Sequence, residues 1–288
     1  MKIITLPSEA QRLSSALRNT GKIIGFVPTM GYLHEGHLSL IKKTRAICDV
    51  LFVSIYINPT QFGKGEDYEK YPRDINRDIL LCRQNGVDYL FTPDNKSIYP
   101  EGFSTYVDAG SITEVLEGRF RPGHFRGVAT IVLKLFNIIQ PHVAVFGQKD
   151  AQQAAIIRKM VRDLNVNTKI LVRPTVREKD GLAMSSRNIY LNPRQRLDAG
   201  ILYKALKYAE NRISDKNFKK DLNYIKSRME KLIKSKTTVS SIDYISFNNN
   251  NTLEEIKTLK NLSGVKILVS LAVRFGKVRL IDNIVVKR

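Results

Sequence analysis

The chain has 288 residues, of which 43% are apolar, and its 47 basic and 27 acidic residues give a formal net charge of +20. This apolar fraction is normal for a globular protein and excludes wholesale disorder. No apolar run is long enough to span a bilayer, and the first ten residues lack the apolar stretch of a signal peptide. We therefore expect a cytoplasmic protein with no membrane contact. Cys48 and Cys82 lie in apolar contexts, where we expect buried thiols rather than a disulfide or metal ligands.

The positive charge permits two classes of protein, a nucleic-acid binder and an enzyme that attracts anionic substrates. A basic segment, 201–236, spreads its Lys and Arg residues around helical positions rather than in one block. Such spreading is typical of a solvated, lysine-rich helix face. We favour this interpretation and expect no nucleic-acid partner, while nucleic-acid binding remains an alternative.

The first part of the chain alternates strand-like and helix-like segments. Continuous apolar runs rich in β-branched residues predict strands that are covered on both faces. This alternation predicts an α/β fold with a Rossmann-like, doubly wound parallel sheet, which binds ligands beyond the carboxyl ends of its strands. The helix at 127–140 is apolar on almost all sides, so we expect it in the sheet packing or at a subunit contact. The predicted strands are 23–27, 50–57, 87–92 and 142–146, and the predicted helices are about 37–47, 74–85 and 127–140.

A second, smaller α+β domain is predicted for residues 176–288, after a first domain of residues 1–175. The boundary falls in the polar stretch Thr175–Asp180. Two amphipathic helices follow, and then a loop at Asn248–Asn251 and two short strands, 265–273 and 278–286, joined at residues 275–277. The apolar positions of the two helices are Leu202, Ala205, Leu206, Ala209 and Ile213, and Leu222, Ile225, Met229, Leu232 and Ile233.

A glycine turn follows the first predicted strand, where Met30-Gly31 leads to His34-Glu35-Gly36-His37 at the start of a helix. Free backbone N–H groups and the helix dipole favour phosphate at such a place. His34 and His37 are three residues apart, so both can face one side of the first helical turn and donate hydrogen bonds to phosphate oxygens. A zinc site would need a third ligand and usually the His-Glu-x-x-His spacing, which is absent here. A structural pair of histidines is the other alternative.

Two further clusters can bind anions. Phe146-Gly147-Gln148-Lys149-Asp150 follows a predicted strand, with Gln152 and Gln153 just beyond, and its lysine could reach a phosphate. Asp150 could either cap the next helix or contact a ribose hydroxyl. Met184-Ser185-Ser186-Arg187-Asn188 combines two hydroxyls with a guanidinium, which suits an anion. With the histidine turn, these clusters predict a triphosphate clamp.

Together with other motifs, these clusters resemble one family along essentially the whole chain. The other motifs are Asn58-Pro59-Thr60-Gln61-Phe62, Tyr71-Pro72-Arg73, Arg121-Pro122-Gly123-His124-Phe125-Arg126-Gly127 and Arg279-Leu280-Ile281-Asp282-Asn283. The family is pantothenate synthetase (pantoate–β-alanine ligase), and the histidine motif alone is similar to the wider superfamily of histidine-motif nucleotidyltransferases and class I aminoacyl-tRNA synthetases.

The resemblance implies a two-step ligation. ATP adenylates the carboxylate of pantoate and releases pyrophosphate with the help of Mg²⁺, and the amine of β-alanine then attacks the pantoyl adenylate to give pantothenate and AMP. Residues 1–175 would bind ATP and pantoate, the smaller domain would close over the site as a lid, and the enzyme would be a homodimer. The shelter of a reactive adenylate from water is a physical reason for such a lid.

The resemblance also implies roles for single residues. His34, His37, Lys149, Ser185, Ser186 and Arg187 would hold the phosphates, and His34, His37, Lys149 and Arg187 are the candidate catalytic residues. Gly147 and Asp150 would meet the ribose, and Met30, Val176 and Met184 would complete the ATP site. Gln61, Gln153 and Tyr71 would bind pantoate, with Met30 packing beside it.

The sequence departs from the family at one point. Members often carry a second acidic residue immediately before the equivalent of Asp78, and here that residue is Arg77. Asp78 is therefore a candidate magnesium ligand without support from its neighbour, and the phosphates could be the main magnesium ligands. Two other functions remain as alternatives, a nucleotidyltransferase that leaves AMP on its product and a nucleotide-sensing module without chemistry.

Overall fold

The computed structural model describes residues 1–215, 217, 218, 221–259, 262 and 264–287. The chain divides into two compact units, one of residues 1–147 and 156–174 and the other of residues 148–155 and 175–288. The short segment 148–155, which follows the fifth strand, thus belongs with the second unit. Within the described residues, no helix is both long enough and apolar enough to cross a membrane.

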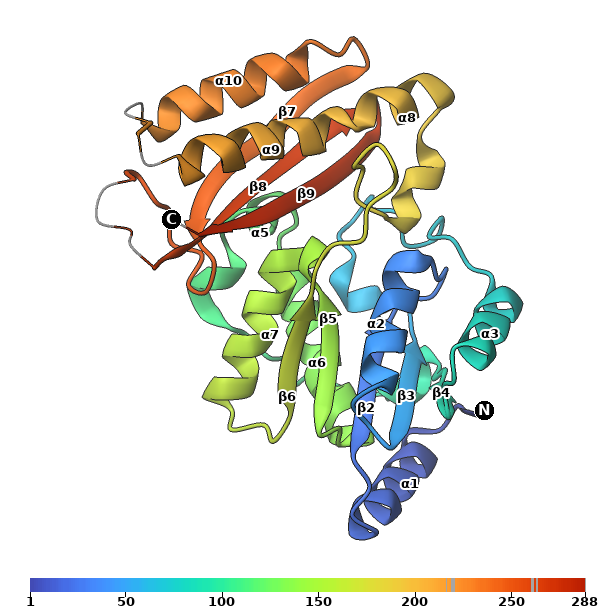
Figure 1. Cartoon of the computed structure of the whole chain (residues 1–288). Helices are drawn as coiled ribbons and strands as arrows, with labels where there is room; N and C mark the ends of the chain where they lie inside the picture. Colours follow the sequence, from blue (N-terminus) through green and yellow to red (C-terminus); the bar gives the residue numbers. More distant parts are fainter. Residues whose placement is uncertain (216, 219–220, 260–261, 263, 288) are drawn as a thin grey trace. The chain divides into compact units, whose positions relative to one another are not determined.

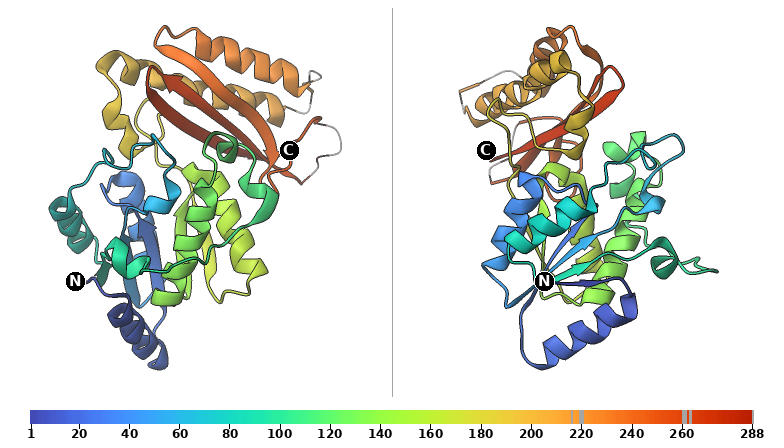
Figure 2. Two further views of the ribbon diagram at one scale, coloured as in Figure 1. Left: turned by 180° about the vertical axis from the view of Figure 1, so that it is seen from behind. Right: turned by 90° about the vertical axis from the view of Figure 1, so that its right-hand side faces the viewer.

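The first unit contains a six-stranded parallel sheet in the order β1-β4-β3-β2-β5-β6. The strand order changes direction at β2, which pairs with β3 on one side and β5 on the other, and helices lie on both faces of the sheet (Figures 1 and 2). The predicted α/β sheet is therefore confirmed. The strands are β1 (Lys2–Ile4), β2 (Ile24–Thr29), β3 (Val50–Ile55), β4 (Tyr89–Phe91), β5 (Val143–Gly147) and β6 (Lys169–Arg173).

The helices predicted between these strands are also confirmed, each within a few residues of its expected bounds. The apolar helix α6 lies in the core of this unit, where the Phe136 ring is 6.4 Å from the rings of Phe26 and Phe146. Cys82 is buried and Cys48 is partly exposed, and both thiols are free. The helices before β6 are α1 (Pro7–Asn19), α2 (Glu35–Arg45), α3 (Ile75–Gln84), α4 (Asn95–Ile98), α5 (Glu117–Phe120), α6 (His124–Ile139) and α7 (Ala151–Asp163), and the 3₁₀-helices are η1 (Pro59–Gln61), η2 (Gly110–Thr113) and η3 (Gln148–Asp150). Of these, η3 and the start of α7 belong to the second unit.

The second unit packs two amphipathic helices, α9 and α10, on a three-stranded antiparallel sheet in the order β7-β8-β9 (Figure 1). The predicted apolar positions of both helices contribute to this core. The loop expected at Asn248–Asn251 begins later than predicted, because Asn248 and Asn249 still pair with β8. The elements are η4 (Ser186–Tyr190), α8 (Pro193–Ala199), α9 (Ile201–Ser214), α10 (Leu222–Lys234), β7 (Val239–Asn249), β8 (Lys266–Phe275) and β9 (Val278–Lys287).

A close approach of α6 to η1 fixes the loop after β3. A Cβ atom at Gly127 would lie 2.3 Å from the Thr60 carbonyl oxygen and 2.8 Å from the Gln61 backbone nitrogen. The Gly127 carbonyl in turn accepts a hydrogen bond of 3.1 Å from Asn58 Nδ2. Only glycine therefore lets the helix backbone meet the loop backbone at this point.

We expect Gly127→Ala to destabilise the protein by about 1–3 kcal/mol, because the new methyl group overlaps backbone atoms that no side-chain rotation can move. In an open helix the same change would stabilise by about 1 kcal/mol, so the sign of the effect is informative. Urea denaturation measures it. Gly63→Ala is the matched control, because its Cβ would meet nothing closer than 3.9 Å. A Gly127→Ala protein as stable as the parent would contradict the close approach.

Candidate active site

The turn between β2 and α2 has a strained backbone. Gly31 has a φ of 82° and Tyr32 a φ of 48°, so two successive residues lie in the left-handed region. A Cβ atom at Gly31 would lie 2.9 Å from Ile55 Cγ2 and 3.0 Å from Asp78 Oδ2, which restricts this position to glycine. The turn follows β2, where the strand order of the sheet reverses, and such positions are the usual ligand sites of parallel sheets.

Asp78, in the first turn of α3, holds this turn. Its Oδ2 accepts a hydrogen bond from the Tyr32 N–H and its Oδ1 accepts one from the Leu33 N–H, both at 2.7 Å. The side chain is only 1% exposed, and burial raises the pKa of Asp78 although these two bonds work in the opposite direction. The Asp78 carboxylate thus holds the backbone of the turn. Its contact with magnesium stays a prediction, and a buried carboxylate whose two oxygens already accept hydrogen bonds does not suit a magnesium ligand.

The two histidines of the motif begin helix α2 and lie against one another. Their ring centroids are 4.1 Å apart. His34 Nδ1 accepts a hydrogen bond from the Gly36 N–H (3.1 Å), and His37 Nδ1 accepts one from the His34 N–H (3.4 Å). A neutral imidazole whose Nδ1 accepts carries its proton on Nε2. The histidines can therefore be both a structural pair and donors to phosphate. In a neutral ring, Nδ1 accepts a backbone N–H at the start of the helix while Nε2–H is a hydrogen-bond donor.

Gln61, at the end of η1, lies beside Met30. Its Nε2 is 2.8 Å from Met30 Sδ, and its Oε1 accepts a hydrogen bond of 3.2 Å from Asn58 Nδ2. These contacts fix which way the amide faces. Gln61 and Met30 are thus in contact, and both side chains belong to the first unit.

A half-buried histidine, His124, supports the backbone of Gln61. Its Nδ1–H donates to the Gln61 carbonyl at 2.7 Å, and its Nε2 lies 3.1 Å from Arg121 Nη1. The same guanidinium pairs with Glu66 through Nη2. Because an Arg nitrogen can only donate, His124 Nε2 must accept, which requires a neutral ring. Burial, and then the charge of Arg121, lower the pKa of His124 to about 4.

Tyr71 is buried in the same part of the first unit. Its ring lies 6.0 Å from the ring of Phe62, the residue after Gln61, and its carbonyl accepts a hydrogen bond from Arg73. Gly147 ends β5, next to β2 in the sheet. Among the described residues, no group of three or more His, Cys, Asp or Glu side chains is arranged to hold a metal ion.

The second unit contains the lysine and serine clusters. Lys149 is in η3, and its Nζ lies 3.2 Å from Asp150 Oδ1. Gln153 lies in the first turn of α7. Met184 donates its N–H to the Val176 carbonyl at 3.0 Å, and Ser185 Oγ accepts from the Arg187 N–H at 3.3 Å.

Two sets of supporting residues were not predicted from the sequence. Asn58, Arg121 and His124 support Gln61, and Asp282 and Asn283 lie beside the Lys149 segment. The sequence analysis named these residues only as parts of longer motifs. Their partners are 60 or more residues away in most cases, so no local pattern could identify them. The signal available from sequence was the unusual concentration of polar residues in short motifs.

We expect His124 to make stability depend on pH. The ordinary histidine pKa of 6.5 applies to the unfolded chain, while the folded pKa is about 4, so the unfolded state binds more protons between these values. The free energy of unfolding should therefore fall as the pH falls from 6.5 to 4, by roughly 3 kcal/mol from this residue. Urea denaturation at several pH values measures this dependence, and the free energy of unfolding should fall less steeply with decreasing pH for His124→Gln than for the parent. An equal pH dependence of the two proteins would contradict a neutral His124.

The sequence and the fold of the chain are similar to those of known proteins of one family. A sequence model described as pantoate-beta-alanine ligase matches residues 2–285. Pantothenate synthetase of Acetivibrio thermocellus is 51% identical over 289 residues, covering 100% of both chains. Pantothenate synthetase of Thermus thermophilus has a TM-score of 0.89 at 41% identity, covering 100% of both chains. Pantoate-beta-alanine ligase of Francisella tularensis, solved with β-γ ATP and β-alanine, has a TM-score of 0.79 at 36% identity, covering 99% of this chain and 97% of that one. The chain belongs to the pantoate–β-alanine ligase family.

Proposed function

We propose that His34 and His37 are neutral hydrogen-bond donors to the phosphates of ATP in the reaction of this family. That reaction is the ATP-dependent ligation of pantoate and β-alanine to pantothenate through pantoyl adenylate, with release of AMP and pyrophosphate. The observation that carries the proposal is the occupation of both Nδ1 atoms by backbone N–H groups, which directs the imidazole protons to Nε2.

The first half-reaction needs charge neutralisation more than acid–base chemistry. A carboxylate oxygen of pantoate attacks the α-phosphorus, a new O–P bond forms, and the bond from that phosphorus to the leaving pyrophosphate breaks. No proton moves in this step. Alignment and stabilisation of the negative charge on phosphoryl oxygens therefore lower the barrier. In the second half-reaction the β-alanine nitrogen attacks the acyl carbon, the C–O bond to AMP breaks, and the nitrogen loses a proton as the amide forms.

Lys149, Ser185, Ser186 and Arg187 are the further phosphate ligands in this proposal. Each offers donors, and the lysine and arginine also bring positive charge, which suits a site that must bind a triphosphate. Met30, Gly147, Asp150, Val176 and Met184 would complete the ATP site. The support for these assignments is the family membership together with the chemistry of the side chains.

Pantoate is proposed to bind Gln61, Gln153 and Tyr71. The Gln61 amide has two donors and two lone pairs, and Asn58 and Met30 take one of each. The remaining donor and lone pair suit the carboxylate and hydroxyl groups of pantoate. Because Asn58 Nδ2 binds the Gln61 amide oxygen, Gln61 would present its remaining donor and lone pair in one fixed orientation.

The proposal has four further parts, which rest on the family resemblance. They are a requirement for magnesium, the role of the smaller domain as a lid, a homodimer and a cytoplasmic location. Mg²⁺ would be held mainly by phosphate oxygens, since this ion binds readily to phosphates and retains several waters. The buried Asp78 carboxylate makes no contribution to the reaction steps proposed here. Its role is to hold the backbone that precedes the histidines.

We expect His37→Ala to slow pantoyl adenylate formation by about 10²–10³-fold, because a donor that acts on developing charge is lost. The dissociation constant for ATP should change far less, because ground-state binding draws on many donors. Pyrophosphate exchange measures the first quantity and calorimetric titration with ATP the second. Ser39→Ala, which removes a hydrogen bond to the Gly36 carbonyl in the same helix turn, is the matched control and should retain both. Equal losses of exchange and ATP affinity in His37→Ala would overturn the transition-state role.

A further inference from the structure

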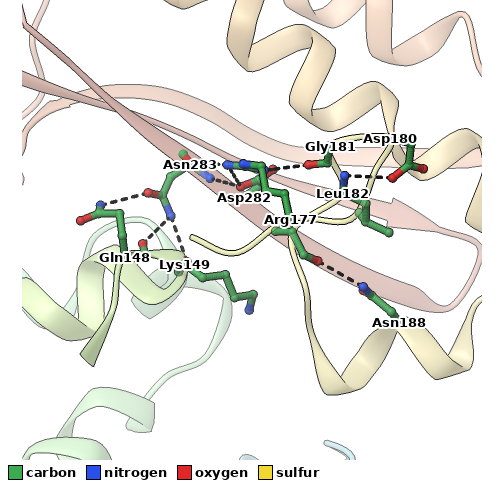
Figure 3. Close-up of polar contacts among 10 residues, drawn as sticks. Gln148, Lys149, Arg177, Asp180, Gly181, Leu182, Asn188, Asp282 and Asn283 are labelled. Atoms are coloured by element: carbon green, nitrogen blue, oxygen red, sulfur yellow. Dashed lines mark hydrogen bonds and ion pairs between the residues drawn. The ribbon is translucent and has the colours of Figure 1, made fainter. Parts of the chain in front are cut away.

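Asn283, on strand β9, contacts the backbone on both sides of Lys149 (Figure 3). Its Nδ2 donates to the Gln148 carbonyl at 3.1 Å and to the Lys149 carbonyl at 2.9 Å, and its Oδ1 accepts from Gln148 Nε2 at 3.1 Å. The side chain is only 4% exposed. Both of its amide hydrogens therefore serve two successive carbonyl groups of one short segment.

These two hydrogen bonds constrain the lysine geometrically. The Gln148 carbonyl belongs to the peptide plane before the Lys149 Cα atom, and the Lys149 carbonyl belongs to the plane after it. Fixing both planes fixes the two backbone torsions of Lys149, and with them the direction of its Cα–Cβ bond. The position of the long lysine side chain thus depends on Asn283, although Asn283 does not need to touch the ammonium group.

A buried ion pair holds Asn283 in turn. Arg177 pairs with Asp282 through Nη1–Oδ2 (2.6 Å) and Nη2–Oδ1 (3.0 Å), and the Asp282 side chain is fully buried. Asp282 Oδ1 also accepts the Asn283 N–H at 2.7 Å, and Arg177 Nη2 donates to the Asn283 carbonyl at 3.1 Å. Both backbone groups of Asn283 are therefore held by one charged pair, which leaves the residue little freedom to turn.

The same ion pair reaches the loop that precedes the serine cluster. Arg177 Nη1 donates to the Gly181 carbonyl at 3.0 Å (Figure 3). The backbone of Arg177 also forms an isolated β-bridge with Ala183. Two residues later the chain arrives at Ser185. Strand β9 is thereby connected to both phosphate-binding candidates of the second unit, the lysine segment and the serine segment.

We propose that Asn283 is a positioning residue for adenylyl transfer, which acts by holding the two peptide planes around Lys149, with the Arg177–Asp282 pair as its support. The proposal rests on the role of Lys149 given under the proposed function. In this proposal Asn283 is not itself a phosphate ligand, and its effect on the reaction passes through Lys149.

The test is a double-mutant cycle in the full-length enzyme, with pantoate-dependent pyrophosphate exchange as the assay. Asn283→Ala should lower kcat about tenfold to hundredfold, because a small displacement of a catalytic group is costly. KM for ATP should change by less than about threefold, because most ground-state contacts remain. In a Lys149→Ala background, Asn283→Ala should have almost no further effect. Asn283→Asp, which keeps the volume but loses the two donors, should reproduce the loss of kcat if the alanine variant folds poorly.

Asn248→Ala is the matched control, because Asn248 is a buried asparagine of the same sheet that donates to the Leu253 carbonyl. It should keep the parent kcat, with any loss confined to stability in urea. The proposal is overturned if Asn283→Ala and Asn248→Ala have the same kcat, or if the Asn283 effect is undiminished without Lys149. A near-parental rate for Lys149→Ala alone would instead refute the proposed function of that lysine, so the two failures are distinguishable.

Discussion

The carboxylate of Asp78 binds two successive backbone N–H groups, those of Tyr32 and Leu33, at the end of strand β2. The turn that it holds contains two residues with positive φ, a conformation that costs free energy and needs support from its surroundings. His34 follows directly, so the start of helix α2 and the orientation of both imidazoles depend on where this turn ends. In the second unit, Asn283 holds the backbone of Lys149 in a comparable way, through carbonyl groups instead of N–H groups. The histidines and Lys149 thus each lie beside a backbone segment that a buried polar side chain holds.

The donors that the site offers match the reaction of the family. The adenylation step moves no proton, and the residues proposed as its phosphate ligands are hydrogen-bond donors and cations, not an acid–base pair. Gln61 follows the same principle, because Asn58 and His124 hold its amide and its carbonyl respectively. Fixed donors lower the barrier without reorganising during the reaction, which is the general advantage of a preorganised site.

Much of the fold could be predicted from the sequence, because buried parallel strands and amphipathic helices leave strong periodic patterns. Strands β1, β6 and β7 were not predicted, and two of them, β1 and β7, lack such patterns. Strand β1 has three residues, of which two are exposed, and β7 mixes serines and asparagines with apolar residues over a half-exposed surface. In the site, glycine turns after strands identified the histidine and lysine segments. The support from Asp78, His124 and Asn283 could not be predicted, because each holds a backbone group that lies 45 or more residues away and that any residue type could supply.

In the reaction of this family, the carboxylate of pantoate is activated by adenylation before β-alanine takes part. The most direct measurement is the exchange of labelled pyrophosphate into ATP with pantoate present and β-alanine omitted. Rapid exchange that requires pantoate and does not require β-alanine is the expected result. Exchange that is absent, or that appears only when β-alanine is added, would contradict it.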